Sequence, residues 1–120
     1  PFMKFIKSFA FAWKGLQYCF LTQLNFRIHL MALLMVSILG GVLKINSIEW
    51  LFILGCSMLV LSLELMNTAI EKICDLITKD IHPVIKVVKD ISAAAVLIAA
   101  IGSLFTGVII FLPKLLNLFR

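Results

Sequence analysis

One stretch of the chain carries acidic, amide and hydroxyl side chains at a spacing that could support chemistry. They recur every three or four residues as Glu64, Asn67, Thr68, Glu71 and Asp75. At 3.6 residues per turn these positions fall on one face of a helix and form a single polar stripe. The stripe follows an apolar run over residues 50–63, and ionisable groups at membrane depth usually face a cavity where they bind or transfer something. The alternative is a solvated helix end, which would suit Glu71 and Asp75 better than the deeper Glu64.

Composition places the chain among integral membrane proteins. Of its 120 residues, 62% are hydrophobic and 14% are charged, and the mean hydropathy is +1.13. A soluble domain is far less apolar. Too few residues lie outside the apolar runs for a second domain, so residues 1–120 are predicted to form a single membrane domain. The N-terminal segment is basic and aromatic but lacks a continuous apolar core, so no cleavable signal peptide is expected.

The net charge and the cysteines exclude other classes of protein. The charge of +5 suits anionic lipid head groups. Because the basic residues are scattered at predicted membrane boundaries, no nucleic-acid partner is expected. The cysteines, at positions 19, 56 and 74, are odd in number and widely spaced. They are predicted to be small buried residues, with neither disulfides nor a zinc site.

Residues 2–22 are predicted to form an amphipathic helix on the membrane surface. Large apolar side chains recur on one face of this helix, and its lysines lie away from that face. Phe11 and Tyr18 interrupt the polar face, so the helix should contact protein there. Arg27 and His29, which follow the helix, are expected to be interfacial anchors.

Three apolar segments are long enough to cross a membrane. We predict spans at about residues 28–45, 50–78 and 93–112. Gly40 and Gly41 would let another helix approach the first span closely. Ser47 is predicted to cap the second helix, Pro83 to begin the third helix, and Pro113 to end it. The predicted fold is an all-α integral membrane protein with one surface helix and three transmembrane helices.

Depth along the second helix divides the polar stripe into two zones. From residue 50 to residue 78 the helix is about 42 Å long, whereas the hydrocarbon core is about 30 Å thick, so one end must emerge into water. If Trp50 marks one interface, Glu64 lies about 21 Å across and Glu71 about 31 Å across. Glu64 is then within reach of a lipid head group, and Glu71 is within reach of a soluble partner. The basic residues concentrate before the first span and around the 79–90 connection, which predicts that the N-terminus and this connection are cytoplasmic.

Charged groups around the stripe supply the parts for phosphoryl transfer. That reaction needs a metal ion to neutralise phosphate oxygens, a cation near the transferred group and a base for the attacking hydroxyl. The candidate groups are Glu64, Glu71, Asp75, His82, Lys89 and Asp90. The chain contains no Gly-rich Walker loop and no protein-kinase signature. The residues by themselves are therefore compatible with this chemistry without specifying it.

Three motifs together resemble the small prokaryotic diacylglycerol kinase family. They are Glu64-x-x-Asn67-Thr68-Ala69-Ile70-Glu71-x-x-x-Asp75, Lys89-Asp90-x-x-Ala93-x-Ala95-Val96-Leu97 and, upstream, Trp13-Lys14-Gly15-Leu16. The resemblance covers nearly the whole chain with consistent spacing. It implies an ATP-dependent lipid kinase of the bacterial inner (cytoplasmic) membrane, with an active site on the cytoplasmic side. It also implies a homotrimer in which helices of adjacent subunits build each site.

The resemblance assigns roles to individual residues. Glu64 would be the catalytic base, and Glu71 would bind the Mg²⁺ that accompanies ATP. Further nucleotide contacts would come from Lys4, Asp80, Ile81, His82, Lys89 and Asp90, with Asn67 and Asp75 supporting the site. One position departs from the family: Gln23 stands where a second metal-binding glutamate is usual. An amide oxygen can bind Mg²⁺ but adds no charge.

The segment Asn25-Phe26-Arg27-Ile28-His29-Leu30 resembles the branch of the family that phosphorylates undecaprenol. The expected reaction is therefore transfer of the ATP γ-phosphate to that lipid alcohol, with diacylglycerol as the alternative acceptor. Two hypotheses from other classes are a small multidrug transporter and a purely structural trimer. A transporter of that kind has four spans rather than three, and a structural trimer would have no use for carboxylates at three depths of one helix.

Overall fold

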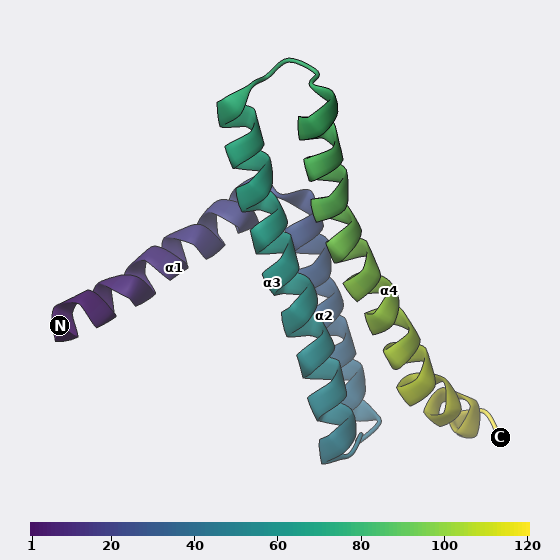
Figure 1. The fold of residues 1–120 in the computed structure, drawn as a ribbon. Coiled ribbons are helices and arrows are strands. Elements are labelled where there is room, and N and C mark those ends of the chain that lie inside the picture. Colours follow the sequence, from purple (N-terminus) through teal and green to yellow (C-terminus); the bar gives the residue numbers. More distant parts are fainter.

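The computed structural model describes residues 1–120 as four helices joined by short connections. The helices are α1 Phe2–Thr22, α2 Leu24–Val42, α3 Ser47–Ile77 and α4 Pro83–Leu118. The last three are long and apolar enough to cross a membrane. α3 and α4 form an antiparallel hairpin, α2 packs along α3, and α1 projects sideways from the joint with α2 (Figure 1). The prediction of an all-helical protein with three candidate spans is confirmed.

The joint between α1 and α2 lies at Gln23, whose extended backbone (φ −112°, ψ 110°) ends one helix and starts the next. α2 therefore begins at Leu24, before the predicted start of the first span at residue 28. Arg27 Nη1 donates hydrogen bonds to Phe20 O at 3.1 Å and to Leu21 O at 3.3 Å. These bonds satisfy carbonyl groups that the end of a helix leaves without partners. Arg27 thus fastens the end of α1 to the start of α2.

The turn between α2 and α3 corrects one prediction. Asn46, not Ser47, caps α3: Asn46 Oδ1 accepts a hydrogen bond from Glu49 N at 2.9 Å, and Glu49 Oε1 accepts one from Asn46 N at 3.0 Å. This reciprocal capping box satisfies two donors at once, which a Ser47 cap without a glutamate three residues later could not do. Lys44 in the turn has φ 53°, so the chain reverses within a few residues.

The glycines of α2 differ in their surroundings. A Cβ atom at Gly40 would lie 2.9 Å from Trp50 Cη2 and 3.0 Å from Ile45 Cδ1, whereas one at Gly41 would meet nothing within 4 Å. The predicted close packing is confirmed for Gly40. Within this chain Gly41 faces open space.

α4 corrects a second prediction. Pro83 does begin the helix, directly after its N-cap His82, but Pro113 does not end it, because the helix continues to Leu118. A proline removes one backbone donor, yet helices tolerate it where packing holds the next turn. Here Phe111 is buried on one side of the proline, and Leu115 packs against the same apolar cluster on the other side.

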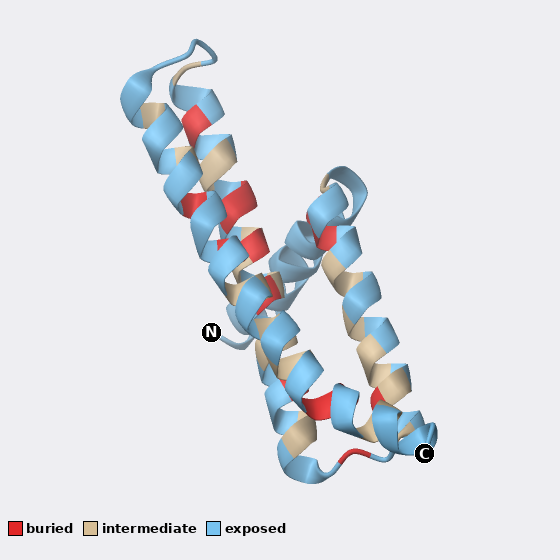
Figure 2. Cartoon of the chain, turned by 90° about the vertical axis from the view of Figure 1, so that its right-hand side faces the viewer, coloured by how far each residue is buried: buried red, intermediate tan, exposed pale blue.

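The apolar core is small and lies at the end of the bundle opposite the α3–α4 turn. It consists of Ile45, Ile53, Ile110 and Phe111, and nearby Lys114 Nζ lies 3.3 Å from Glu49 Oε1. The buried residues follow the inner sides of the helices, while the outer sides are exposed (Figure 2). All three cysteines are free; Cys19 and Cys74 are buried, as predicted, and Cys56 is half-buried. The large apolar exposed surface is the kind that lipid or another subunit covers.

Candidate active site

The polar stripe of α3 runs from buried to exposed. Glu64, Asn67 and Thr68 are 2%, 7% and 3% exposed, Glu71 is half-buried, and Asp75 is exposed. The solvated-end alternative therefore fits Asp75 but not Glu64. A carboxylate this deeply buried is costly unless something partners it, so Glu64 requires an explanation beyond solvation.

Hydrogen bonds within the stripe leave one fully buried side-chain oxygen without a partner. Asn67 Nδ2 donates to Glu71 Oε1 at 3.2 Å, and Thr68 Oγ1 donates to Glu64 O at 2.9 Å. Asn67 Oδ1 is buried and accepts no hydrogen bond. An unpaired buried acceptor costs stability, and such a group in a native protein usually indicates a missing partner. The stripe thus offers a hard oxygen ligand beside two carboxylates.

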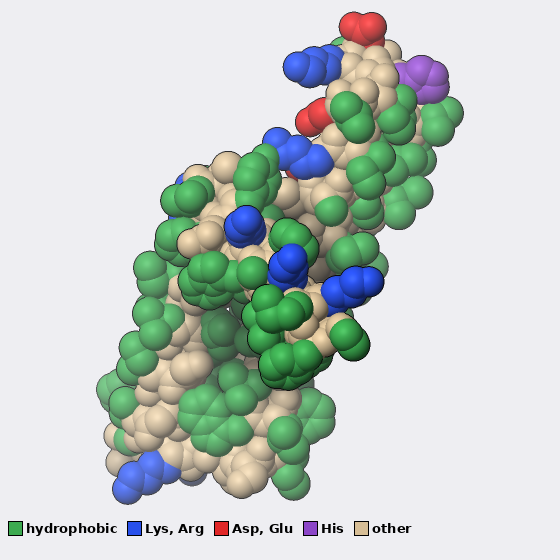
Figure 3. Space-filling model, turned by 90° about the vertical axis from the view of Figure 1, so that its left-hand side faces the viewer, with side chains coloured by type: hydrophobic (Ala, Val, Ile, Leu, Met, Phe, Trp, Pro, Cys, Tyr) green, Lys and Arg blue, Asp and Glu red, His purple; other side chains and the backbone are tan.

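Charged groups from α4 meet the stripe at its exposed end. Lys89 Nζ lies 2.7 Å from Asp75 Oδ1, and Lys86 Nζ lies 2.8 Å from Asp90 Oδ2 one turn further along α4. The end of the α3–α4 hairpin also carries acidic and histidine side chains on its surface (Figure 3). The structure thereby brings Asp75 and Lys89, which are fourteen positions apart, into direct contact.

The connection between α3 and α4 is exposed, and its polar groups organise the start of α4. Asp80 N donates to Thr78 Oγ1 at 3.0 Å. His82 Nδ1 accepts a hydrogen bond from Val84 N at 3.2 Å and so caps α4. Ile81 is 95% exposed. Because the cap uses Nδ1, only Nε2 of His82 is available to a ligand.

Two residues that the family resemblance singled out lie apart from the α3–α4 end. Lys4 is exposed on the free end of α1, which points away from the hairpin (Figure 1). Gln23 is half-buried at the α1–α2 joint, where its Nε2 donates to Thr22 Oγ1 at 3.3 Å and its amide oxygen accepts no hydrogen bond. No three acidic, histidine or cysteine side chains converge as a metal-binding group. One chain therefore brings together the stripe and α4, but not Lys4.

α1 is held against α3 by a contact that sequence reasoning anticipated only in part. Lys72 Nζ lies over the Tyr18 ring, 5.2 Å from its centroid. Tyr18 was predicted to contact protein because it interrupts the polar face of α1, and that prediction is confirmed. The partner could not be named, since nothing in the local pattern pairs position 18 with position 72.

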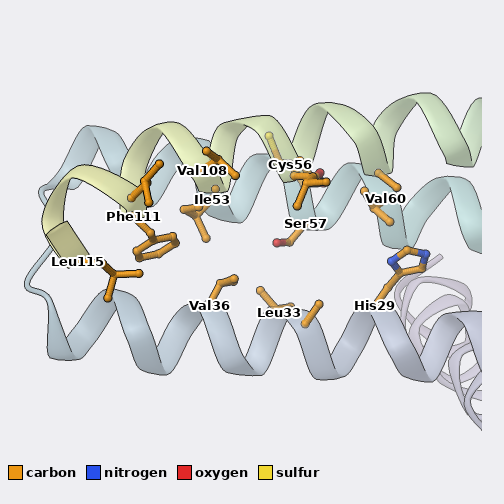
Figure 4. A pocket seen from close by; sticks show the side chains of 16 residues that line it. His29, Leu33, Val36, Ile53, Cys56, Ser57, Val60, Val108, Phe111 and Leu115 are labelled. Atoms are coloured by element: carbon orange, nitrogen blue, oxygen red, sulfur yellow. The ribbon is translucent and has the colours of Figure 1, made fainter.

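A chamber of about 570 Å³ lies between α2, α3 and α4, and most of its lining is apolar. Figure 4 shows His29 at the end near α1, and Phe111 and Leu115 at the other end. Val60 also lines the chamber, and Glu64 follows it by about one helical turn. Sequence reasoning treated His29 as an interfacial anchor. The structure shows that its half-buried side chain faces the space between the helices.

The structure has three candidate membrane spans and a stripe of carboxylates whose burial is graded, and comparison with known proteins identifies the class of protein. The chain belongs to the prokaryotic diacylglycerol kinase family, whose model matches residues 10–111. It is therefore a lipid kinase, and the transporter hypothesis is wrong.

Individual relatives cover nearly all of the chain. An undecaprenol kinase of Bacillus subtilis is 43% identical over 112 residues, which are 93% of this chain and 91% of that protein. A diacylglycerol kinase of Synechocystis is 41% identical over 92% of this chain, but the match spans only 64% of the relative. A diacylglycerol kinase of Escherichia coli is 32% identical over 91% of this chain and 89% of the relative.

Proposed function

We propose that this protein transfers the γ-phosphoryl group of ATP to the hydroxyl group of undecaprenol. The observation that carries the proposal is the burial gradient of the α3 stripe, from exposed Asp75 to Glu64 at 2% exposure. The gradient supplies charged groups where ATP arrives from water and a carboxylate where a lipid alcohol arrives from the membrane. The choice of lipid is supported by the similarity to the Bacillus subtilis undecaprenol kinase. Diacylglycerol is the alternative, because the Synechocystis and Escherichia coli relatives are diacylglycerol kinases.

Glu64 is the base in this proposal. Its carboxylate takes the proton of the lipid hydroxyl while the hydroxyl oxygen attacks the γ-phosphorus, and ADP leaves with the bridging oxygen. A base must lie within hydrogen-bonding reach of that hydroxyl, which sits at the membrane interface. Glu64 meets this requirement better than Glu71 or Asp75, because those residues lie about two and three turns closer to the exposed end of α3.

The nucleotide occupies the exposed end of the hairpin. Lys89 provides a cation for the phosphates, and Asp75 holds that cation through their 2.7 Å contact. Further contacts come from Asp80, Ile81, His82, Asp90 and Lys4. The start of α4 suits a phosphate group, since backbone N–H groups and the helix dipole favour negative charge there.

Mg²⁺ is the expected cofactor, and the residues present fit it. Mg²⁺ prefers oxygen ligands and is usually bound through one or two carboxylates together with waters and substrate phosphates. Glu71 and the amide oxygen of Gln23 would hold the ion, and the unpaired Asn67 Oδ1 beside Glu71 is a further oxygen in reach of the same region. When bound, the ion neutralises charge on the phosphate oxygens.

The complete site is proposed to form in a homotrimer, with helices of adjacent subunits contributing to each site. Two features support this assembly: the outer faces of the helices are apolar and exposed, and Lys4 lies away from Lys89 within one chain. α1 would lie on the cytoplasmic surface of the bacterial inner membrane as an amphipathic helix, because aromatic side chains line it and its lysines follow the positive-inside rule.

A lipid phosphorylation assay tests the proposed function. Purified protein in mixed micelles receives radiolabelled ATP, Mg²⁺ and either undecaprenol or diacylglycerol, and specificity constants are measured for both lipids. The proposal predicts a higher kcat/KM for undecaprenol, with Glu64→Gln as the inactive control. A clearly higher kcat/KM for diacylglycerol would show that diacylglycerol, the alternative, is the preferred substrate. Phosphorylation of neither lipid would overturn the proposal.

A further inference from the structure

We propose that His29 is a positioning residue for Glu64, and that its imidazole N–H holds the Glu64 carboxylate in the orientation that accepts the proton of the lipid alcohol. This inference rests on the proposed function, in which Glu64 is the base. It assigns a role to a residue on a different helix, α2, that lies outside the stripe.

The placement of His29 is the first argument. His29 and Val60 line the same chamber from facing helices, and Figure 4 shows the imidazole directed across that space. Glu64 lies about one turn beyond Val60 on α3. Among the α2 residues that line the chamber, His29 is the one that can donate a hydrogen bond toward α3.

Elimination of other donors is the second argument. Glu64 is 2% exposed, and the one side-chain hydrogen bond at this residue goes to its backbone oxygen rather than to its carboxylate, which is unfavourable for a buried carboxylate. The Thr68 hydroxyl donates to the backbone oxygen of Glu64, and Asn67 Nδ2 donates to Glu71 Oε1, so neither donor is available to the Glu64 carboxylate. Glu71 has the same charge as Glu64 when both are ionised, so it cannot orient it. His29 remains.

The chemistry of a base supplies the third argument. An active-site base is effective when a third group fixes its orientation, because a freely rotating carboxylate meets the hydroxyl in few of its positions. His29 makes no hydrogen bond within the chain, so its N–H groups are available. Catalytic hydrogen bonds are often long in the ligand-free state and shorten when substrate binds.

Three substitutions at position 29 test the assignment. His29→Leu removes the donor, His29→Asn keeps a donor but shortens its reach, and His29→Gln keeps both a donor and its reach. Loss of a partner that orients a metal-binding residue costs about 10- to 100-fold in activity, and we take the same scale for a partner of the base. We expect that loss in kcat for His29→Leu and His29→Asn, with KM for ATP unchanged, and recovery of most of kcat in His29→Gln. Unchanged KM for ATP also shows that the variants are folded.

A matched control separates orientation from packing. Leu33 lies one turn from His29 on α2 and lines the same chamber, so Leu33→Ala disturbs the chamber without touching the donor. It should change KM for the lipid and leave kcat near the wild-type value. Equal losses of kcat in Leu33→Ala and His29→Leu would assign the effect to packing and overturn the proposal.

A double-mutant cycle provides the decisive measurement. Glu64→Asp retracts the carboxylate by one methylene group, out of reach of the imidazole, so His29→Leu should cost little more in that background. Independent, fully additive losses would show that His29 does not act through Glu64. The two proposals fail separately. An active Glu64→Gln variant would contradict the assignment of Glu64 as the base, whereas a fully active His29→Leu variant would contradict only the role of His29.

Discussion

Lys89 Nζ lies 2.7 Å from Asp75 Oδ1, and this ion pair joins α4 to α3 at the water-exposed end of the hairpin. The side chains are 38% and 51% exposed, so solvent screens their attraction and the pair contributes little to stability. Its effect is geometric, because it fixes an ammonium group next to the polar stripe.

Exchange of the two charges separates these effects. The double variant Asp75→Lys, Lys89→Asp retains an ion pair, so its thermal unfolding midpoint in detergent should stay close to that of the wild type. KM for ATP should nevertheless rise, because the cation has moved from α4 to α3. Lys114→Met, which breaks the ion pair with Glu49 at the other end of α4, is the control for disturbance of an ion pair and should leave KM for ATP unchanged. A charge-exchanged protein with wild-type nucleotide kinetics would show that the position of the ammonium group is irrelevant.

Glu64→Gln and Glu71→Gln should fail in different ways. Loss of a general base typically costs about 10²- to 10⁴-fold in kcat and does not concern the nucleotide, so Glu64→Gln should bind ATP almost normally. Glu71→Gln removes charge from the proposed metal site, and it should raise the concentrations of Mg²⁺ and ATP needed for half-maximal activity. Titration of both variants with each ligand measures the difference. Equal loss of nucleotide binding in the two variants would contradict the division of roles.

Gln23→Glu should strengthen Mg²⁺ binding and raise activity. A carboxylate adds negative charge and a harder oxygen ligand than an amide, and the amide oxygen of Gln23 has no other hydrogen-bonding role in the chain. The measurement is the Mg²⁺ dependence of lipid phosphorylation, with Thr22→Val as a control for disturbance of the α1–α2 joint. If the Mg²⁺ dependence of Gln23→Glu equals that of the wild type, Gln23 serves only as a joint residue.

Gly40→Ala and Gly41→Ala form a matched pair for stability. A Cβ atom at Gly40 would lie 2.9 Å from the Trp50 ring, and overpacking of this kind costs about 1–3 kcal/mol. At Gly41 the same atom meets open space, and alanine is the better helix former by about 1 kcal/mol. Unfolding in detergent should therefore show a destabilised Gly40→Ala variant and an unchanged or stabilised Gly41→Ala variant. The reverse order would mean that another subunit packs on Gly41.

The pattern of apolar and polar residues along the sequence was sufficient to predict most of the helices. Hydrophobic runs and residue spacing predicted the number of spans and the first helix at residues 2–22, and the period of 3.6 residues placed Glu64, Asn67 and Thr68 on a shared face, which the structure buries. These features depend on neighbours within one helix, which is why a linear sequence contains them.

The two errors at helix ends have different causes. The cap at Asn46 follows from the local sequence, because Asn46 and Glu49 have the spacing of a capping box and Ser47 lacks a glutamate three residues later. The continuation of α4 beyond Pro113 could not be predicted from the local sequence. It depends on the packing of Phe111 and Leu115 against residues from the α2–α3 end, and that packing outweighs the local preference of proline.

The sequence by itself determined which chemical groups the protein has and the helical stripe that carries them. Only the tertiary structure decided which groups from different helices meet. Lys89 forms an ion pair with Asp75, Lys72 lies over the Tyr18 ring, and His29 lines the chamber between the helices. The physical reason is that contacts between helices depend on how each helix is rotated about its axis and where it crosses its neighbour. The packing of the whole bundle sets those two quantities, and the periodicity of a single helix does not.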